Sequence, residues 1–227
     1  MKTIGLLGGM SWESSIEYYR IMNETVRERL GGLHSAKCII YSVEFGEIEP
    51  LLIAESYDEL KDSLSSAARS IAGAGADFFL IGTNTMHMFA DAIEEAAGIP
   101  LLHIADATGE AIVKADLDMV ALLGTSVTME ADFYRDRLKD RYDIYTVIPE
   151  NRTEFDRIIF DELCRGIISD SSADTVQAAI DDCISCGAEG VILGCTELPL
   201  MVSGCEVPLF DTTRIHAEAA VSKALDE

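Results

Sequence analysis

With 227 residues, of which 48% are hydrophobic and 25% charged, the chain is long enough for one large domain or two small ones, and intrinsic disorder is excluded. The formal net charge of −23, from 40 acidic and 17 basic side chains, disfavours nucleic acid and anionic membranes as partners. No apolar run is long enough to span a bilayer, and the first residues lack a signal-peptide pattern, so we expect a cytoplasmic protein.

Short apolar runs alternate with helical patterns along the chain. Strands are predicted at residues 3–8, 37–43, 77–82, 99–103, 119–124, 143–147, 189–194 and 207–210. Helices are predicted at residues 14–30, 57–72, 105–115, 132–139, 153–164, 173–186 and 212–225. This alternation predicts an α/β fold with parallel sheets covered by helices.

One phrase occurs twice, as GADFFLIGTNT from residue 75 and as GAEGVILGCTE from residue 187. Two further matches keep the same order and nearly the same spacing: IGLLGG with VALLGT, and IPLL with VPLF. Three matches in register indicate an internal duplication. We therefore expect two α/β halves, residues 1–114 and 115–211. The closing helix at 212–227 either stays with the second half or packs back on the first.

Each copy of the repeated phrase ends in a polar residue, Thr83 in the first and Cys195 in the second. Ligands of open parallel α/β sheets bind beyond the carboxyl ends of the strands, where loop N–H groups attract anions and favour a thiolate. Halves related by an approximate two-fold axis would place the hydroxyl and the thiol on opposite sides of one carbon. That arrangement suits racemisation or epimerisation. The alternatives are an inert buried thiol and a hydroxyl that only caps a turn.

Polar groups close to these two positions are candidates for binding a substrate carboxylate and stabilising enolate-like charge. They are Asn84, Thr85, Thr125, Thr128 and Thr196, and Met10 of the glycine-rich turn at residues 8–12 is a further binding candidate as a wall of the site. Glu197 would either tune Cys195 or cap the next helix, and His87 is more typical of packing than of a base. The basic candidates for holding an anion are Arg152, Arg165 and Arg214, for which solvent exposure is the default interpretation.

Cofactor and metal sites are not expected. The glycine-rich turn at residues 8–12 lacks the GxGxxG spacing of a dinucleotide site. Cys183 and Cys186 form a CxxC pair without a second pair of zinc ligands. We interpret this pair as two small core residues, with a redox pair as the less favoured alternative, and we expect all six cysteines to be reduced.

Four strings closely resemble the aspartate/glutamate racemase family: LLGGMSW, GTNTMH, GCTE and FDTT. The resemblance covers nearly the whole chain. It implies two Rossmann-like domains with a cleft between them, and cofactor-independent racemisation of acidic amino acids by two cysteines. Cys195 matches one of these cysteines, whereas Thr83 stands at the position of the other. A subgroup of the family with this threonine prefers L-amino acids.

Two further departures concern the substrate. Dicarboxylate racemases of the family often have a lysine in the region that reads ELCRG here, where Arg165 would take its place. The loop at residues 43–47 is acidic where some relatives are basic. Both departures weaken the case for aspartate in particular. The resemblance also suggests a homodimer, although no surface pattern in the sequence indicates one.

We therefore expect an isomerase, a racemase of L-aspartate or L-glutamate that works without pyridoxal phosphate. Cys195 would abstract or return the α-proton, and Thr83 would act on the opposite face. One alternative is an enzyme similar to maleate isomerase or arylmalonate decarboxylase that uses Cys195 alone. Another is an amino-acid-binding relative without catalytic turnover.

Overall fold

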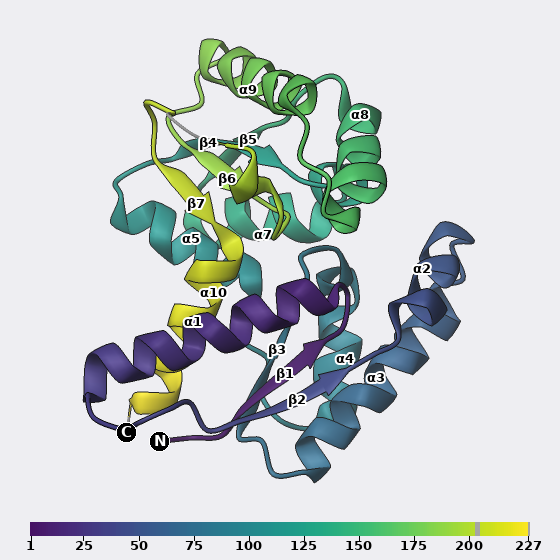
Figure 1. The fold of residues 1–227 in the computed structure, drawn as a ribbon, viewed down its shortest axis with the longest axis vertical. Coiled ribbons are helices and arrows are strands. Elements are labelled where there is room, and N and C mark those ends of the chain that lie inside the picture. Colours follow the sequence, from purple (N-terminus) through teal and green to yellow (C-terminus); the bar gives the residue numbers. More distant parts are fainter. Residues whose placement is uncertain (203–204, 227) are drawn as a thin grey trace. The chain divides into compact units, whose positions relative to one another are not determined.

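The computed structural model describes residues 1–202 and 205–226, and it contains two parallel sheets (Figure 1). The predicted α/β fold with parallel sheets is therefore confirmed. The chain divides into two compact units. The first unit comprises Met1–Ile104 and the chain from His216 onward, and the second comprises Ala105–Ile215.

The first unit has a three-stranded sheet in the order β2-β1-β3. Its strands are β1 (Ile4–Gly8), β2 (Cys38–Ser42) and β3 (Phe78–Ile81). Its helical elements are α1 (Trp12–Leu30), α2 (Phe45–Ile53), α3 (Tyr57–Gly73), the 3₁₀ helix η1 (Thr85–Phe89) and α4 (Ala90–Ala97). Most of α10 (Thr212–Leu225) also belongs to this unit.

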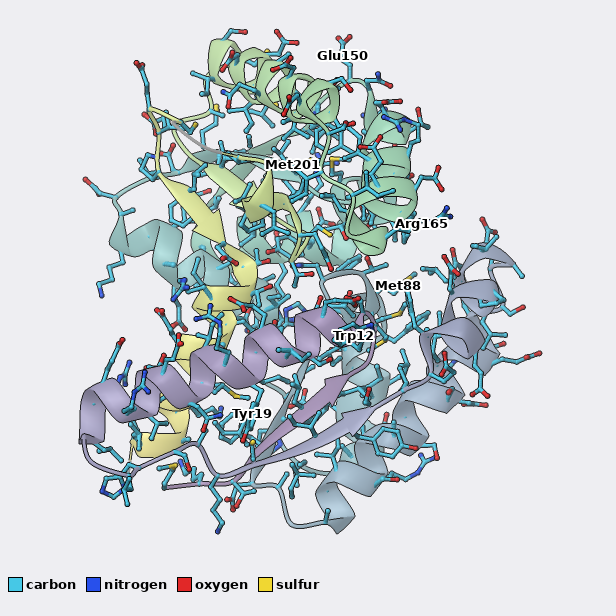
Figure 2. All side chains as sticks on the ribbon, viewed as in Figure 1. Trp12, Tyr19, Met88, Glu150, Arg165 and Met201 are labelled. Atoms are coloured by element: carbon cyan, nitrogen blue, oxygen red, sulfur yellow. The ribbon has the colours of Figure 1, made fainter. Side chains whose placement is uncertain are left out.

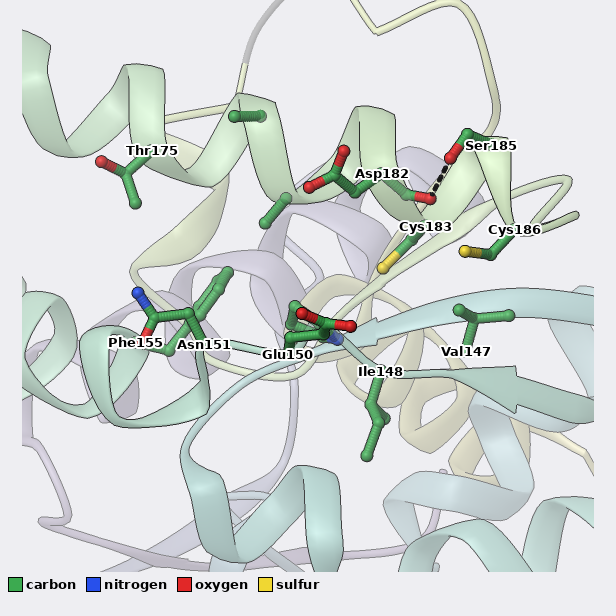
Figure 3. A pocket seen from close by; sticks show the side chains of 13 residues that line it. Val147, Ile148, Glu150, Asn151, Phe155, Thr175, Asp182, Cys183, Ser185 and Cys186 are labelled. Atoms are coloured by element: carbon green, nitrogen blue, oxygen red, sulfur yellow. Dashed lines mark hydrogen bonds between the residues drawn. The ribbon is translucent and has the colours of Figure 1, made fainter.

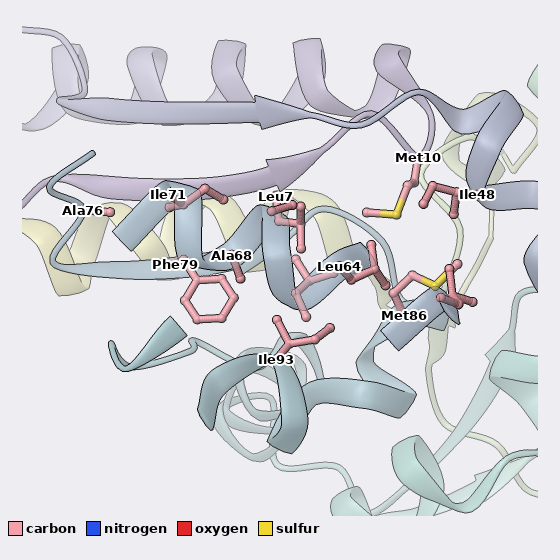
Figure 4. Packing of buried hydrophobic residues seen from close by; sticks show 13 residues of the cluster. Leu7, Met10, Ile48, Leu64, Ala68, Ile71, Ala76, Phe79, Met86 and Ile93 are labelled. Carbon is pink, nitrogen blue, oxygen red and sulfur yellow. The ribbon is translucent and has the colours of Figure 1, made fainter. Parts of the chain in front are cut away.

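Apolar side chains alternate between the two faces of this sheet, as the period of a β-strand requires. Ile4 and Leu6 of β1 pack in one cluster with residues of α1 and α10. Leu7 and Phe79 pack on the other face with residues of α3 and α4, including Leu64 (Figure 4). Full burial of such a side chain stabilises the fold by about 2 kcal/mol. The two clusters therefore hold β1 firmly between its helical layers.

The second unit has a four-stranded sheet in the order β5-β4-β6-β7. Its strands are β4 (Met119–Leu123), β5 (Tyr145–Val147), β6 (Val191–Leu193) and β7 (Leu209–Asp211). Its helices are α5 (Ile104–Lys114), α6 (Ser126–Glu130), α7 (Asp132–Tyr142), α8 (Arg152–Asp156) and α9 (Asp170–Ser185). Short π and 3₁₀ segments complete it: η2 (Arg157–Glu162), η3 (Leu163–Arg165) and η4 (Leu198–Leu200).

The two sheets have matching topology. In each, the first strand in the chain lies between the second and the third, and a fourth extended segment borders the third. In the second unit this segment is β7, whereas in the first it is only a bridge between Leu101 and Phe79. The prediction of a strand at residues 99–103 is therefore wrong, because this segment forms only an isolated bridge. Pro100 lacks an N–H for a ladder, and α5 begins already at Ile104.

Other local differences lie in the helices. The segment predicted as one helix at 153–164 is broken into α8, the π-helical η2 and the 3₁₀ helix η3. The sequence analysis does not predict the helices α2, α4 and α6. Two of them have weak helical signals, because α2 contains Pro50 and α6 is only five residues long. Within the described part of the chain, no helix has the length and apolar character needed to cross a membrane.

Candidate functional site

A glycine directly follows the third strand of each unit, β3 and β6, and makes the same hydrogen bond in both. The Gly82 N–H donates to the Leu7 carbonyl at 2.8 Å, and the Gly194 N–H donates to the Leu123 carbonyl at 2.6 Å. A Cβ atom at position 194 would lie 2.7 Å from the Leu123 carbonyl oxygen, so only glycine fits there without displacement. The next residues, Thr83 and Cys195, therefore occupy equivalent positions beyond matching strands.

On the first unit, Thr83 is half-buried and precedes η1. Its backbone carbonyl accepts a hydrogen bond from His87 Nδ1 at 2.8 Å. Asn84 and Thr85, two of the predicted binding residues, are buried beside it. Met10, another of them, is buried in the apolar cluster that also contains Leu7. The side chain of Met10 therefore acts first as a core residue.

Three of the four histidines in the chain lie together near the loop that contains Thr83. The ring of His87 is 4.5 Å from that of His103 and 5.9 Å from that of His216, measured between centroids. His216 Nε2 donates to the Leu102 carbonyl at 2.8 Å, so its Nδ1 accepts from the Tyr18 hydroxyl, also at 2.8 Å. Residue spacing in the sequence does not reveal this cluster, because its members come from three separate segments.

Burial lowers the pKa of His216 from 6.5 to about 4. Burial, followed by the neighbouring histidines, lowers the pKa of His87 well below its usual value. Both rings are therefore neutral at physiological pH, and charging either one would place a cation in a dry environment.

Because His216 stays neutral in the folded protein, we expect the free energy of unfolding to fall in acid. Between pH 6.5 and about 4, the unfolded chain binds a proton at position 216 that the folded chain does not, so the free energy of unfolding falls as pH drops through this range. The shift corresponds to about 3 kcal/mol. His216→Gln keeps an N–H donor for Leu102 but does not titrate, so its unfolding free energy should fall less. Urea unfolding at pH 7 and pH 4 measures this difference, and an equal fall in both proteins would contradict the assignment.

On the second unit, Cys195 is half-buried beyond β6, and its thiol donates to Glu197 Oε2 at 3.0 Å. Burial raises the pKa of Cys195 well above 9, and the negative charge of Glu197 raises it further. The sequence-based expectation of a thiolate favoured by loop N–H groups is therefore wrong for this state. The resting thiol is protonated and points its proton at a carboxylate.

The sequence leaves two roles open for Glu197, tuning of Cys195 or capping of the next helix, and its contacts favour the first. Its carboxylate accepts hydrogen bonds from Cys195 and from the Thr196 hydroxyl. It precedes η4 but makes no capping hydrogen bond to that helix. The carboxylate is thus directed at the thiol and not at the helix that follows.

Thr125 and Thr128, the predicted binding residues after β4, are buried and bonded to each other. Thr125 Oγ1 lies 3.1 Å from Thr128 Oγ1 and accepts from the Thr128 N–H at 3.3 Å. Thr125 thereby caps α6. This turn is the counterpart of the one after β1, where Ser11 caps α1 through the Ser14 N–H at 3.3 Å.

The segment at η3 lies close to Cys195, a proximity that the sequence did not reveal. The Cys164 thiol is near enough to contribute to the raised pKa of Cys195. Arg165 follows it, and its exposed side chain projects outward and pairs with Asp161 at 3.3 Å (Figure 2). Such an exposed pair contributes little stability, so the guanidinium is available for another anion.

The other two basic candidates have partners of their own. Arg152 Nε lies 2.7 Å from Glu130 Oε1. The backbone N–H of Arg214 donates to Asp211 Oδ1 at 3.1 Å, at the start of α10. Neither contact links these arginines to Cys195.

The CxxC pair lines a separate cavity of about 480 Å³ between α9 and the loop after β5 (Figure 3). Cys183 is buried, and burial raises its pKa to about 11. Cys186 is exposed at the carboxyl end of α9, so the interpretation of the pair as two core residues is correct for Cys183 and wrong for Cys186. A buried thiol with a raised pKa forms a thiolate poorly, which disfavours a redox pair. Among residues 1–202 and 205–226, no group of three or more histidine, cysteine or acidic side chains is arranged to hold a metal ion.

The fold is that of an α/β protein with two parallel sheets, and ligands of such folds commonly bind beyond the carboxyl ends of the strands. The family model of the Asp/Glu/Hydantoin racemases matches residues 7–220. The chain belongs to this family, and it is accordingly an isomerase of the racemase class. The predicted resemblance is confirmed.

Individual relatives agree with this assignment. The chain is 25% identical to the broad specificity amino-acid racemase RacX of Bacillus subtilis (strain 168), with 98% of both chains covered. It is 50% identical to the crystal structure of a putative Asp/Glu racemase from Yersinia pestis, with a TM-score of 0.93 and full coverage of both chains. An aspartate racemase homologue from Pyrococcus horikoshii OT3 is 35% identical, with a TM-score of 0.85 and full coverage of both chains.

Proposed function

We propose that the protein racemises acidic amino acids, L-aspartate or L-glutamate, without a cofactor. Cys195 exchanges the α-proton on one face of the substrate, and Thr83 acts on the other. The observation that carries this proposal is the equivalent pair of glycine hydrogen bonds, Gly82 to Leu7 and Gly194 to Leu123, which gives Thr83 and Cys195 the same position in duplicated sheets.

The Cys195 side supplies the base. Its thiol proton passes to the Glu197 carboxylate along the 3.0 Å hydrogen bond, and the thiolate then takes the α-proton of the L-substrate. The electron pair left on the α-carbon delocalises into the substrate carboxylate. The polar groups proposed to stabilise that charge are those of Asn84, Thr85, Thr125, Thr128 and Thr196, with Met10 as an apolar wall.

The Thr83 side delivers a proton to the opposite face, from its hydroxyl or from a water molecule bound to it. Solvent then takes the proton held by Glu197 and replaces the one lost at Thr83, which restores both groups. A threonine hydroxyl is a poor acid and a poor base near neutral pH, whereas a thiol exchanges its proton more readily. The proposed enzyme is therefore asymmetric, with faster proton abstraction from the L-enantiomer than from the D-enantiomer. Arg165 is the proposed partner of the distal carboxylate.

Incubation with L-amino acids in heavy water tests the proposed function. Deuterium should appear at the α-carbon of L-aspartate or L-glutamate, as seen by NMR. The panel includes neutral and basic amino acids, because RacX is named for broad specificity. Absence of α-deuteration with every amino acid, in folded protein, would reject a racemase. Turnover of maleate or of a disubstituted malonate instead would establish the alternative chemistry.

Thr83→Cys tests the asymmetry. A second thiol should raise the rate of α-deuteration of the D-enantiomer by about tenfold, because general acid–base efficiency depends on how closely the pKa of the group matches the working pH. The rate for the L-enantiomer should change much less. Parallel measurements on both enantiomers give the comparison, and Thr83→Val is the control that keeps the shape but removes the hydroxyl. Equal gains for both enantiomers in Thr83→Cys would contradict the assigned faces.

A further inference from the structure

Thr83 is held in place by a side chain that the proposed reaction does not use. His87 lies four residues further on, in η1, and is only 2% exposed. Its Nδ1 atom lies 2.8 Å from the Thr83 carbonyl oxygen. Its other nitrogen, Nε2, lies 3.2 Å from the backbone N–H of Ile104, where α5 begins. One ring therefore ties the loop after β3 to the segment that starts α5.

The partners of this ring fix its tautomer. A carbonyl oxygen can only accept a hydrogen bond, so Nδ1 must carry the proton that points at Thr83. A backbone N–H can only donate, so Nε2 of His87 must be the bare nitrogen that faces Ile104. Both contacts are satisfied only by the neutral ring with its proton on Nδ1.

The surroundings preserve that neutral form. The rings of His103 and His216 lie against His87, and the Tyr18 hydroxyl bonds to His216. A proton on Nε2 would remove the bond to the Ile104 N–H and bury a positive charge beside two other imidazoles. The loop that contains Thr83 thus rests on a rigid, uncharged ring.

We propose that His87 is a positioning residue: its Nδ1–H, by holding the Thr83 carbonyl, directs the Thr83 hydroxyl toward the substrate face that this residue serves. The inference rests on the proposed function and goes beyond it, since it assigns the geometry of the weaker proton donor to a buried imidazole. Loss of the hydrogen bond slows proton delivery on the Thr83 face and leaves abstraction by Cys195 largely intact.

Two variants separate the contacts of His87. His87→Asn places an amide N–H near the position of Nδ1, and Asn23 of the same chain already donates in this way to the carbonyl four residues back, at 2.7 Å. His87→Gln places its amide near the position of Nε2, so it can accept from Ile104 but does not hold Thr83. Both variants remove the ring and its packing, so they are matched in that respect.

The experiment measures two rates in heavy water with the L-substrate: deuterium incorporation into remaining L-substrate, and formation of the D-product. Their ratio does not depend on the amount of active enzyme. For His87→Gln, D-product formation should fall about fivefold relative to exchange, the effect expected from loss of one hydrogen bond. For His87→Asn, the ratio should stay within about twofold of wild type. Equal ratios in both variants would overturn the positioning role while leaving racemisation established.

Two further outcomes are distinguishable. A wild-type protein without α-deuteration rejects the proposed function, and this inference with it. If His87→Gln does not fold, ¹⁵N NMR of the wild-type imidazoles decides the matter. Resonances of a neutral, Nδ1-protonated His87 that does not titrate between pH 5 and 9 would support the proposal, and an Nε2-protonated ring would overturn it.

Discussion

Replacement of Cys195 by serine is expected to lower α-deuteration of the L-substrate by about 10³-fold, within the range seen when a general base is removed. Serine has nearly the shape of cysteine, and its hydroxyl can still donate to Glu197. Its pKa, however, lies far above that of a thiol, so it cannot act as the base at neutral pH. The measurement is the initial rate of deuterium incorporation by NMR at saturating substrate.

The matched control is Cys186→Ser, which makes the same chemical change in the same unit. Cys186 is exposed at the end of α9 and makes no contact that the reaction uses. Exchange should be unchanged in this variant, and thermal unfolding of both variants should stay close to wild type. If Cys195→Ser exchanged the α-proton at the wild-type rate, Cys195 would not be the base. The proposal that Cys195 and Thr83 act on opposite faces of the substrate would then be rejected.

The fold was predictable because its signal is local and repeated. Apolar runs ending in glycine at Gly8, Gly82, Gly124 and Gly194 mark buried strands, and the two copies of one phrase indicate two similar sheets. Where the pattern is weak, prediction fails. The segment around Pro100 reads as a strand, yet it makes only one bridge because the proline removes a donor and a helix begins immediately afterwards.

The candidate site was only half predictable for a different reason. Thr83 and Cys195 stand out because duplication makes them comparable, and Glu197 because it is next but one to Cys195. The buried imidazoles near Thr83 come from positions 87, 103 and 216, and no sequence spacing connects them. The protonation state of Cys195 was also hidden, since it depends on burial and on the direction of the Glu197 carboxylate, both set by tertiary structure.

Glu197→Gln is expected to change two observables in opposite directions. The charge of Glu197 and its acceptance of the thiol proton both raise the pKa of Cys195. An uncharged amide therefore lowers the pKa of the thiol, and the thiolate forms at a lower pH. Alkylation of Cys195 by iodoacetamide, followed as a function of pH, should reach half its maximal rate at a lower pH than in wild type.

Exchange should nevertheless become slower in Glu197→Gln, by about 10²-fold at neutral pH, because an amide cannot accept the proton that the thiol must release. The control is Glu189→Gln, an exposed residue that precedes β6, whereas Cys195 follows the other end of this strand. Faster alkylation together with slower exchange would identify Glu197 as the acceptor of the Cys195 proton. A rise in both rates would instead mean that the charge of Glu197 only suppresses formation of the thiolate. The substrate or solvent would then have to take the proton of the Cys195 thiol.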